Sequence, residues 1–340
     1  MDNDFIGNLR DTKKWQTAPM LITKDTLQQQ IKEATEARNK AAEERRESEQ
    51  MRTAINSLSD GRISVDKTIS NKDTLKNIMA SVLRMKQFRD GDLFPGYTVI
   101  SDPEDKKWDS LVNGEFYGGN HLTGTKNKPY EINLRNSDVP QFNDFIGKNN
   151  IESGWWPRTG DKIESSVPTH ELSHSSQKEA GKKTNYPNLT LDYAERVKRQ
   201  NFHNTHSSLQ ELFDKAAENL GYKNLQEAVA GVSGYAQSNA EDEAAGNIKR
   251  PANWSPGVRL PEVFAEAFTD VLYNKDKAAP YSKELINLYS NYVDDYEKTF
   301  GAKANNNIDS FKQAFWILPP LGDEETFIDK LRSLRILPQK

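Results

Sequence analysis

The feature that most constrains this chain is an H-E-x-x-H run at residues 170–174. On a helix, residues four positions apart lie on one face, one turn from each other, so His170 and His174 can direct two imidazoles at one metal ion. Glu171 lies next to the first of them, where its carboxylate can take a proton from a water molecule on that ion. The run therefore predicts a helix with two metal ligands and a general base.

The start of this helix is predicted from the residues just before the run. Ser165 or Ser166 can cap the first turn, and Pro168 suits that turn because the N–H that proline lacks has no helical partner there. The alternative interpretation is a polar surface helix with two incidental histidines. The chain has only five histidines, and two of them fall in the run, which favours the metal site.

A third metal ligand is expected from another helix. Catalytic zinc sites usually take three protein ligands, and the extended pattern H-E-x-x-H-x-x-G-x-x-H is excluded because Gln177 and Ala180 occupy its Gly and His positions. The segment 261–272 has apolar residues at helical spacing. Acids recur every four residues along one border of that apolar stripe, namely Glu262, Glu266 and Asp270. Their alternative role is the solvated face of an amphipathic helix.

The motif E-x-F-A-E-A-F, which begins at Glu262 and follows the H-E-x-x-H run, carries a family resemblance. It resembles the catalytic domain of anthrax lethal factor and the wider group of lethal-factor-like zincins, which includes toxin domains and phage head-associated proteins. The resemblance covers roughly residues 128–275. It implies that Glu262 is the third zinc ligand and that Glu266 steadies a ligating histidine, a role that Asp270 can share. It also implies that Tyr235 stabilises the transition state.

One departure from the family concerns residues 240–260. In the family the tyrosine segment runs almost directly into the glutamate helix, whereas here these residues intervene. The departure leaves Glu241 or Glu243 open as an alternative third ligand. The second half of the insertion is rich in turn-forming residues, and it is expected to form a loop, with a flap over the site as the hypothesis.

Composition limits the classes of partner and compartment. The chain has 340 residues, 35% of them hydrophobic and 28% charged, and its net charge of −4 gives no reason to expect nucleic acid. No apolar run is long enough to span a membrane, and the N-terminus lacks the signal-peptide pattern. Cysteine is absent, so neither disulfides nor thiolate ligands are available. We expect a protein made in the cytoplasm without a signal peptide, and either virion-associated or delivered into a target cell.

Three segments are expected along the chain. Residues 1–20 read as an N-terminal arm, and residues 21–60 as a long charged helix that serves as a spacer or docking element. Residues 61–340 would form the zincin-like metalloprotease domain. A docking partner, if the helix serves that purpose, would bind through residues 1–60.

A small sheet is predicted ahead of the metal helix. Segments 96–100, 115–117 and 130–134 have strand patterns, and the strand around Ile132 is proposed as an edge strand that pairs with an extended substrate. The alternative for that strand is an ordinary core strand. The paired tryptophans at 155–156 are expected to close the core under a loop, with a substrate pocket as the less favoured role.

The sequence as a whole predicts an α+β, predominantly helical, zincin-like metalloprotease domain behind an N-terminal helical extension. Its expected activity is zinc-dependent cleavage of a protein or peptide substrate, with one zinc ion per chain held by His170, His174 and Glu262. Glu171 and Tyr235 would be the catalytic residues. The alternatives are a catalytically weak or inactive structural protein of a virion or secretion system, and a zinc-stabilised binding module.

Overall fold

The computed structural model describes residues 24–88, 93–103, 114–117, 126–135, 148–157, 163–183, 193–248 and 259–300. The predicted arm at 1–20 and residues 249–258 of the insertion lie outside these ranges. The chain divides into two compact units, residues 1–47 and residues 48–340. Within the described ranges, each helix is too short or too polar to cross a membrane.

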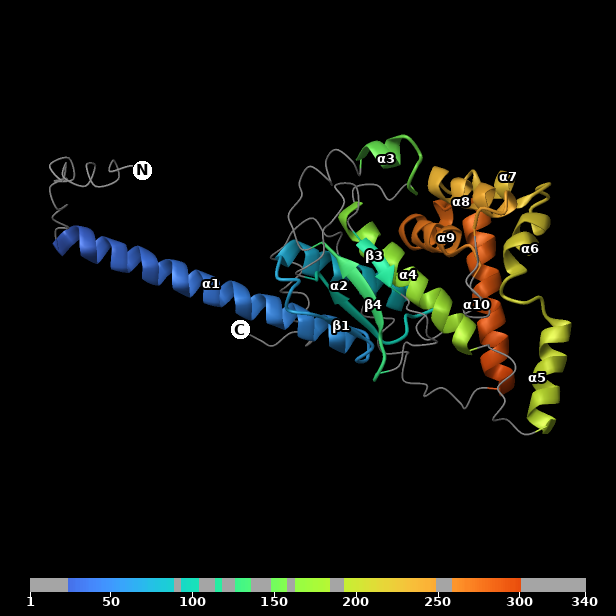
Figure 1. Ribbon diagram of the computed structural model, residues 1–340, viewed down its shortest axis with the longest axis horizontal. Helices are drawn as coiled ribbons and strands as arrows, with labels where there is room; N and C mark the ends of the chain where they lie inside the picture. The colour runs from blue at the N-terminus through green and yellow to red at the C-terminus, as the bar shows by residue number, and fades with distance from the viewer. Residues whose placement is uncertain are drawn as a thin grey trace, which may run out of the picture. The chain divides into compact units, whose positions relative to one another are not determined.

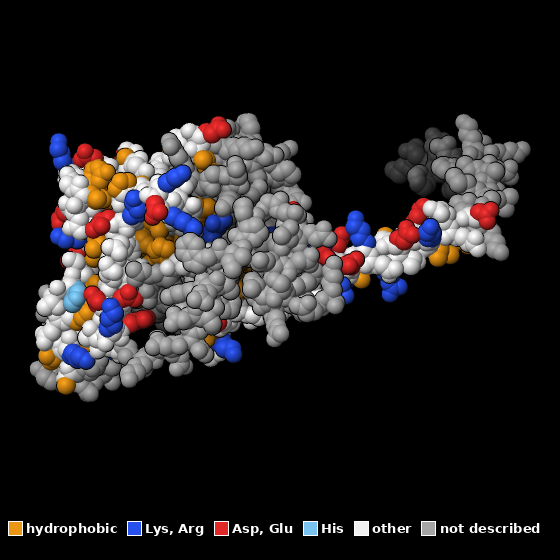
Figure 2. Space-filling view, turned by 180° about the vertical axis from the view of Figure 1, so that it is seen from behind, with side chains coloured by type: hydrophobic (Ala, Val, Ile, Leu, Met, Phe, Trp, Pro, Cys, Tyr) orange, Lys and Arg blue, Asp and Glu red, His pale blue; other side chains and the backbone are white. Residues whose placement is uncertain are grey.

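The first unit contains most of a single long helix, α1, which spans Lys24–Leu58 and continues into the second unit. Its described side chains are exposed from Asp25 to Arg46. Acidic and basic side chains alternate along it (Figure 2), and neighbours one turn apart pair, as Lys32 does with Glu36 at 4.0 Å. Such pairs stabilise an exposed helix by a few tenths of a kcal/mol each.

The division between the units falls within α1, after Glu47. Met51, Ile55 and Leu58 are buried and belong to the hydrophobic core of the second unit. Apolar residues return at helical spacing in this last part of the helix. The last turns of α1 are therefore part of the larger unit.

The second unit is predominantly helical with one small sheet, which confirms the α+β expectation (Figure 1). Its elements, in order, are β1 (Ile63–Val65), α2 (Lys72–Phe88), β2 (Thr98–Ser101), β3 (Gly114–Tyr117), β4 (Tyr130–Leu134), α3 (Lys148–Glu152), α4 (Ile163–Lys183), α5 (Tyr193–Thr205), α6 (Leu212–Asn219), α7 (Leu225–Val229), α8 (Gly234–Ala244), α9 (Pro261–Asn274), a short 3-10 helix (Lys275–Lys277) and α10 (Pro280–Phe300).

The sheet has the strand order β1-β2-β4-β3. The first three of these strands are parallel, with Ile100 opposite Ile132, and β3 is antiparallel to β4. Along β4, Tyr130, Ile132 and Leu134 are buried and Glu131 is exposed. This alternation places one face of the sheet against the core.

The position of β4 corrects the expectation that the strand around Ile132 is an edge strand. Because β4 pairs with β2 on one side and β3 on the other, its backbone groups are used in two ladders. The alternative, an ordinary core strand, is confirmed for Ile132. Among the described strands β3 lies at that edge of the sheet.

Helix α4 occupies the centre of the second unit, where it packs against α9, α2, β3 and β4 (Figure 1). Several of its buried positions are serines, whose small side chains allow neighbouring elements to approach closely. Ser173 donates to the carbonyl of Thr169 at 2.7 Å, and the hydroxyl of Ser175 lies 3.0 Å from that of Thr98 on β2. These buried hydroxyls are therefore paired, and one of them ties α4 to the sheet.

A second tie between α4 and the sheet depends on the absence of a side chain at Gly96. The hydroxyl of Tyr130 on β4 forms a hydrogen bond with the carboxylate of Glu179 on α4. A Cβ at Gly96 would lie 2.6 Å from Glu179 Oε2 and 2.8 Å from Tyr130 Cε2. Both distances are shorter than carbon contacts allow, so any larger residue must displace this pair.

We expect Gly96→Ala to lower the free energy of unfolding by about 1–3 kcal/mol, the usual cost of overpacking a core. Urea denaturation followed by circular dichroism measures this change. Gly231→Ala is the matched control, because a Cβ there meets nothing within 4 Å. Equal denaturation midpoints for Gly96→Ala and the wild type would contradict the proposed packing.

Candidate metal centre

Helix α4 carries the H-E-x-x-H run, as predicted, but it begins earlier than the sequence suggests. The helix starts at Ile163, so Ser165 and Ser166 are not its caps and Pro168 lies inside it. Proline has no N–H to donate to the carbonyl four residues earlier, so it weakens the helix at this point. Capping chemistry alone therefore placed the helix start too late.

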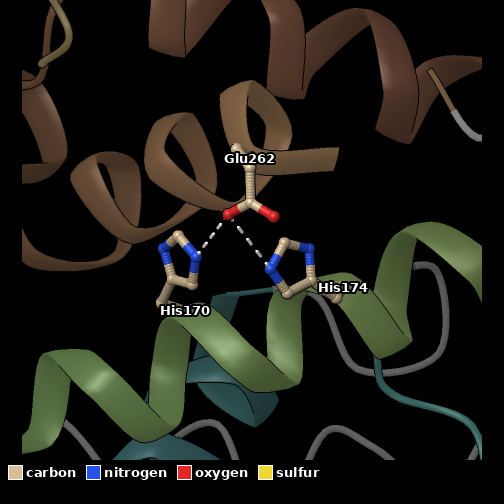
Figure 3. A group of neighbouring side chains, drawn as sticks. All are labelled: His170, His174 and Glu262. Carbon is tan, nitrogen blue, oxygen red and sulfur yellow. Dashed lines mark hydrogen bonds and ion pairs between the residues drawn. The ribbon is translucent and has the colours of Figure 1, made fainter. Parts of the chain in front are cut away.

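Helix α9 brings the third candidate ligand. Pro261 occupies its first position, and Glu262 lies in the first turn. The preceding residue, Leu260, has a φ of 46°, the left-handed conformation that non-glycine residues rarely adopt. The left-handed conformation of Leu260 directs the start of α9, and with it the Glu262 carboxylate, toward α4 (Figure 3).

The side chains of His170, His174 and Glu262 converge (Figure 3). Glu262 Oε2 lies 3.0 Å from His170 Nε2 and 3.5 Å from His174 Nε2, and the three ligand atoms all lie within 4.8 Å of one another. Ligand atoms around a tetrahedral zinc ion are roughly 3.3–3.6 Å apart. Two imidazole nitrogens and one carboxylate oxygen are also a donor set that catalytic zinc sites use. The group could therefore hold a divalent metal ion.

Glu266 lies one turn further along α9, against the other nitrogen of His170. Its Oε1 is 2.8 Å from His170 Nδ1, and the carboxylate is buried. A carboxylate in this place accepts the Nδ1–H and so leaves Nε2 directed at the metal position. The structure thus places Glu266 where the sequence resemblance implies. Its Oε2 is buried without a hydrogen-bond partner among the described residues.

Asp270 is not part of this group, contrary to the expectation that it shares the role of Glu266. Its Oδ1 accepts a hydrogen bond from Asn274 at 2.7 Å, and its Oδ2 accepts one from the backbone N–H of Ala279 at 2.8 Å. Both partners lie toward the end of α9 and the turn that follows. The four-residue repeat of acids therefore serves two purposes, with Asp270 holding the connection to α10.

The charges at the centre stabilise one another. Burial lowers the pKa of His170, but its hydrogen bonds to Glu262 and Glu266 outweigh this and raise it well above the ordinary value. Burial raises the pKa of Glu262, but the two histidines outweigh this and hold it well below the ordinary value. The imidazole of His170 and the Glu262 carboxylate therefore favour each other's charged forms.

Tyr235 reaches the centre from the first turn of α8, which begins after the Ser233 cap. Its ring centroid is 6.3 Å from that of His170, and the charge of the Glu262 carboxylate acts on its hydroxyl. Burial is the largest cause that raises the pKa of the Tyr235 hydroxyl. The carboxylates of Glu262, Glu266 and Glu171 raise it further. The hydroxyl therefore stays neutral at physiological pH and can donate a hydrogen bond.

The candidate general base, Glu171, is buried on α4 beside His170. Its charge contributes to the raised pKa of Tyr235, which places the two side chains in one electrostatic environment. Trp155 also lies here, with its ring centroid 5.9 Å from that of Tyr235 and 42% of the residue exposed. The expectation that both tryptophans close the core is therefore wrong for Trp155.

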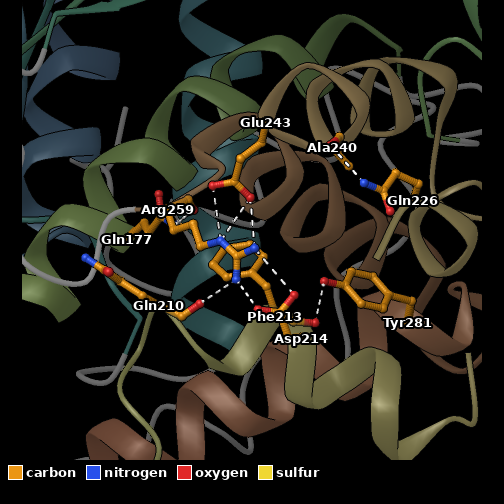
Figure 4. A network of polar contacts seen from close by, with 9 residues as sticks. All are labelled: Gln177, Gln210, Phe213, Asp214, Gln226, Ala240, Glu243, Arg259 and Tyr281. Carbon is orange, nitrogen blue, oxygen red and sulfur yellow. Dashed lines mark hydrogen bonds and ion pairs between the residues drawn. The ribbon is translucent and has the colours of Figure 1, made fainter. Parts of the chain in front are cut away.

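The alternative ligands, Glu241 and Glu243, are engaged elsewhere. Glu241 is exposed and accepts a hydrogen bond from Gln237 at 2.9 Å. Glu243 receives the guanidinium of Arg259, with Nη2 at 2.9 Å and Nε at 3.0 Å from its Oε2 (Figure 4). Neither residue joins the metal-ligand group found among the described residues.

Arg259 connects several elements just before Glu262 (Figure 4). Besides Glu243 on α8, its guanidinium pairs with Asp214 on α6 and donates to the carbonyl of Gln210 at 3.0 Å. The backbone carbonyl of Arg259 accepts a hydrogen bond at 2.9 Å from Gln177, which lies one turn after His174 on α4. The chain that leads into the ligand helix is therefore fixed to three other helices.

Sequence reasoning missed Arg259 and Gln177. The sequence does point to Gln177, because it lies three residues after His174 and therefore on the same face of the helix. The structure shows that it is buried. Nothing in the sequence points to Arg259, since its partners come from α6 and α8.

Comparisons with known proteins add no assignment: no protein-family model, no curated protein and no solved structure matches the chain.

We expect Arg259→Gln to weaken metal binding by about tenfold, as removing an outer support of a ligand commonly does. The physical reason is that Glu262 would lose its fixed approach to the two histidines. Competition with a chromophoric chelator measures the dissociation constant. Arg45→Gln, at an exposed position on α1, is the control. An unchanged dissociation constant for a folded Arg259→Gln protein would refute this role.

We also expect metal binding to release a proton near pH 7. The folded pKa of His170 is raised, so its ion pairs contribute stability fully below the unfolded value of 6.5, and this contribution is lost as pH rises through the folded pKa. At pH 7 a metal ion must therefore displace the proton on Nε2. Calorimetric titration with the metal in buffers of different ionisation enthalpy measures the number of protons released. Glu266→Gln should reduce the count, whereas equal heats in all buffers would contradict the expectation.

Proposed function

We propose that this chain is a zinc-dependent endopeptidase of the H-E-x-x-H…E type that cleaves a protein or peptide substrate. The observation that carries the proposal is the meeting of His170 and His174 on α4 with Glu262 on α9. The sequence resemblance to lethal-factor-like zincins supports the same function. In that family the matching residues belong to toxins or to phage head-associated proteins, so a toxin, an effector or a virion-associated protein is proposed as the setting.

The three ligands would hold the zinc ion, which would supply Lewis acidity toward the attacking water and the scissile carbonyl. Glu171, buried beside His170, would take a proton from that water and then give it to the leaving amine. Because the carboxylate sits next to a ligand in sequence, the helix fixes its position relative to the site.

Two further side chains would support the reaction. The pKa of Tyr235 is raised, so its neutral hydroxyl is suited to donate a hydrogen bond to negative charge on the substrate oxygen. Glu266 would hold the Nδ1–H of His170 and keep the ring in the tautomer that binds zinc.

The edge strand β3 supports a peptide as the substrate. It pairs only with β4 among the described strands, and it lies against α4, the helix that carries the histidines. The free side of an edge strand presents N–H and C=O groups to which an extended peptide can add. The pairing proposed for the strand around Ile132 is therefore reassigned to β3.

A structural or interaction protein with the same fold is the second candidate. The observation in its favour is a pair of exposed apolar side chains in the first unit. Leu27 is 48% exposed and Ile31 is 57% exposed, on one face of α1. Two apolar side chains one turn apart are suited to a docking partner. Both candidates keep the metal, and they differ in the role of Glu171.

We expect Glu171→Gln to reduce peptide cleavage by at least about a hundredfold while the zinc content stays near one ion per chain, because the base is lost and the ligands remain. Mass spectrometry of a peptide library and elemental analysis measure the two quantities. Glu218→Gln, exposed on α6, is the control. If the zinc-loaded wild type cleaves nothing across a broad library, the interaction protein is favoured and the peptidase is rejected.

A further inference from the structure

An exposed indole lies beside the metal centre. Among the large apolar side chains that the described residues expose, Trp155 is the aromatic one, with 42% of the residue accessible. A single exposed apolar residue needs no explanation by itself. Here, however, the indole is adjacent to Tyr235, with ring centroids 5.9 Å apart and planes tilted by 46°.

Tyr235 links this indole to the metal position. Its ring centroid is 6.3 Å from that of His170, and the charge of the Glu262 carboxylate acts on its hydroxyl. Trp155 is therefore one aromatic ring away from two candidate ligands. A peptide whose scissile carbonyl sat at the metal would carry side chains at Cα positions about 3.8 Å apart. One of the side chains flanking that bond would therefore come within reach of the indole.

Backbone contacts hold Trp155 in place. The N–H of Gly234 donates to the carbonyl of Gly154 at 2.7 Å, and the N–H of Tyr235 donates to the carbonyl of Trp155 at 3.1 Å. A Cβ at Gly234 would lie 2.9 Å from Trp155 Cε3 and 3.4 Å from Trp155 Cα. The segment after α3 is thus fastened to the start of α8, and the glycine makes this close approach possible.

We propose that Trp155 forms the wall of a substrate subsite that takes an aromatic or large apolar side chain next to the scissile bond. This inference rests on the proposed peptidase function and names the class of substrate. A fixed indole with exposed surface gains from burying an apolar partner, and aromatic pairs favour centroid separations of 4.5–7 Å. Because the backbone already holds the indole, little conformational entropy is lost on binding.

A basic side chain is the competing occupant, because a cation can also lie over an indole. The carboxylates that would attract it are committed elsewhere. Glu262 and Glu266 lie 3.0 Å and 2.8 Å from the two ring nitrogens of His170, and Glu171 is buried. The geometry therefore favours an uncharged partner at this subsite.

The experiment compares two metal-binding probes, phenylalanine hydroxamate and glycine hydroxamate, on the zinc-loaded full chain. The expected result is about tenfold tighter binding of the phenylalanine probe, measured by calorimetry. Trp155→Ala removes the wall and Gly234→Ala displaces it, so both should bring the ratio close to one. Trp155→Phe should retain most of the preference. Leu220→Ala, which removes an exposed apolar side chain at the end of α6, is the control and should change nothing.

The outcomes separate this inference from the peptidase proposal. Equal affinities of the wild type for the two probes, or binding of neither, overturn the subsite. Tighter binding of lysine hydroxamate than of the phenylalanine probe overturns its apolar character. If the preference is present and depends on Trp155 while no peptide in a library is cleaved, the subsite stands and the peptidase proposal fails.

Discussion

The architecture of the second unit depends on how ionisable side chains are satisfied where α4 packs against α9. A buried carboxylate or imidazolium costs several kcal/mol unless an opposite charge compensates it. Glu262 and Glu266 both contact His170, on its two ring nitrogens, so each charge has a partner. A shift of α9 by one residue would turn both carboxylates away by about 100°. Pairing the charges therefore fixes the register of two helices that otherwise meet through apolar side chains such as Leu172 and Phe264.

The same constraint gives the residues before α9 a role. The first turn of a helix is free to fray unless the chain before it is held, and here that turn carries the ligand carboxylate. The guanidinium of Arg259 pairs with Glu243 and Asp214 and donates to the backbone carbonyl of Gln210. The backbone carbonyl of Arg259 accepts a hydrogen bond from Gln177. The left-handed Leu260 that follows is buried, so packing maintains a conformation that costs about 1–2 kcal/mol. The predicted loop thus ends in a rigid connection, and this connection orients the metal ligand.

Local patterns were sufficient to predict some of this arrangement. Helical periodicity identified α9, the H-E-x-x-H spacing identified the ligand face of α4, and strand patterns identified β4 at residues 130–134. The predictions that failed concern features that depend on contacts with other elements. Whether β4 is an edge strand depends on where β3 pairs, and whether Asp270 faces a histidine depends on the turn after α9. Tyr235 was found through family resemblance, since nothing in its own neighbourhood shows that α8 begins next to α4.

The contacts that join α4 and α9 bear on the role proposed for a metal ion. A structural zinc ion is enclosed by four protein ligands, and its domain commonly unfolds when it is removed. Here three donors converge within the described part of the chain, and the two helices already share a hydrophobic core and the ion pairs of His170. The two helices therefore have contacts of their own besides any ion that these donors would hold. These features support a catalytic ion over a zinc-stabilised binding module.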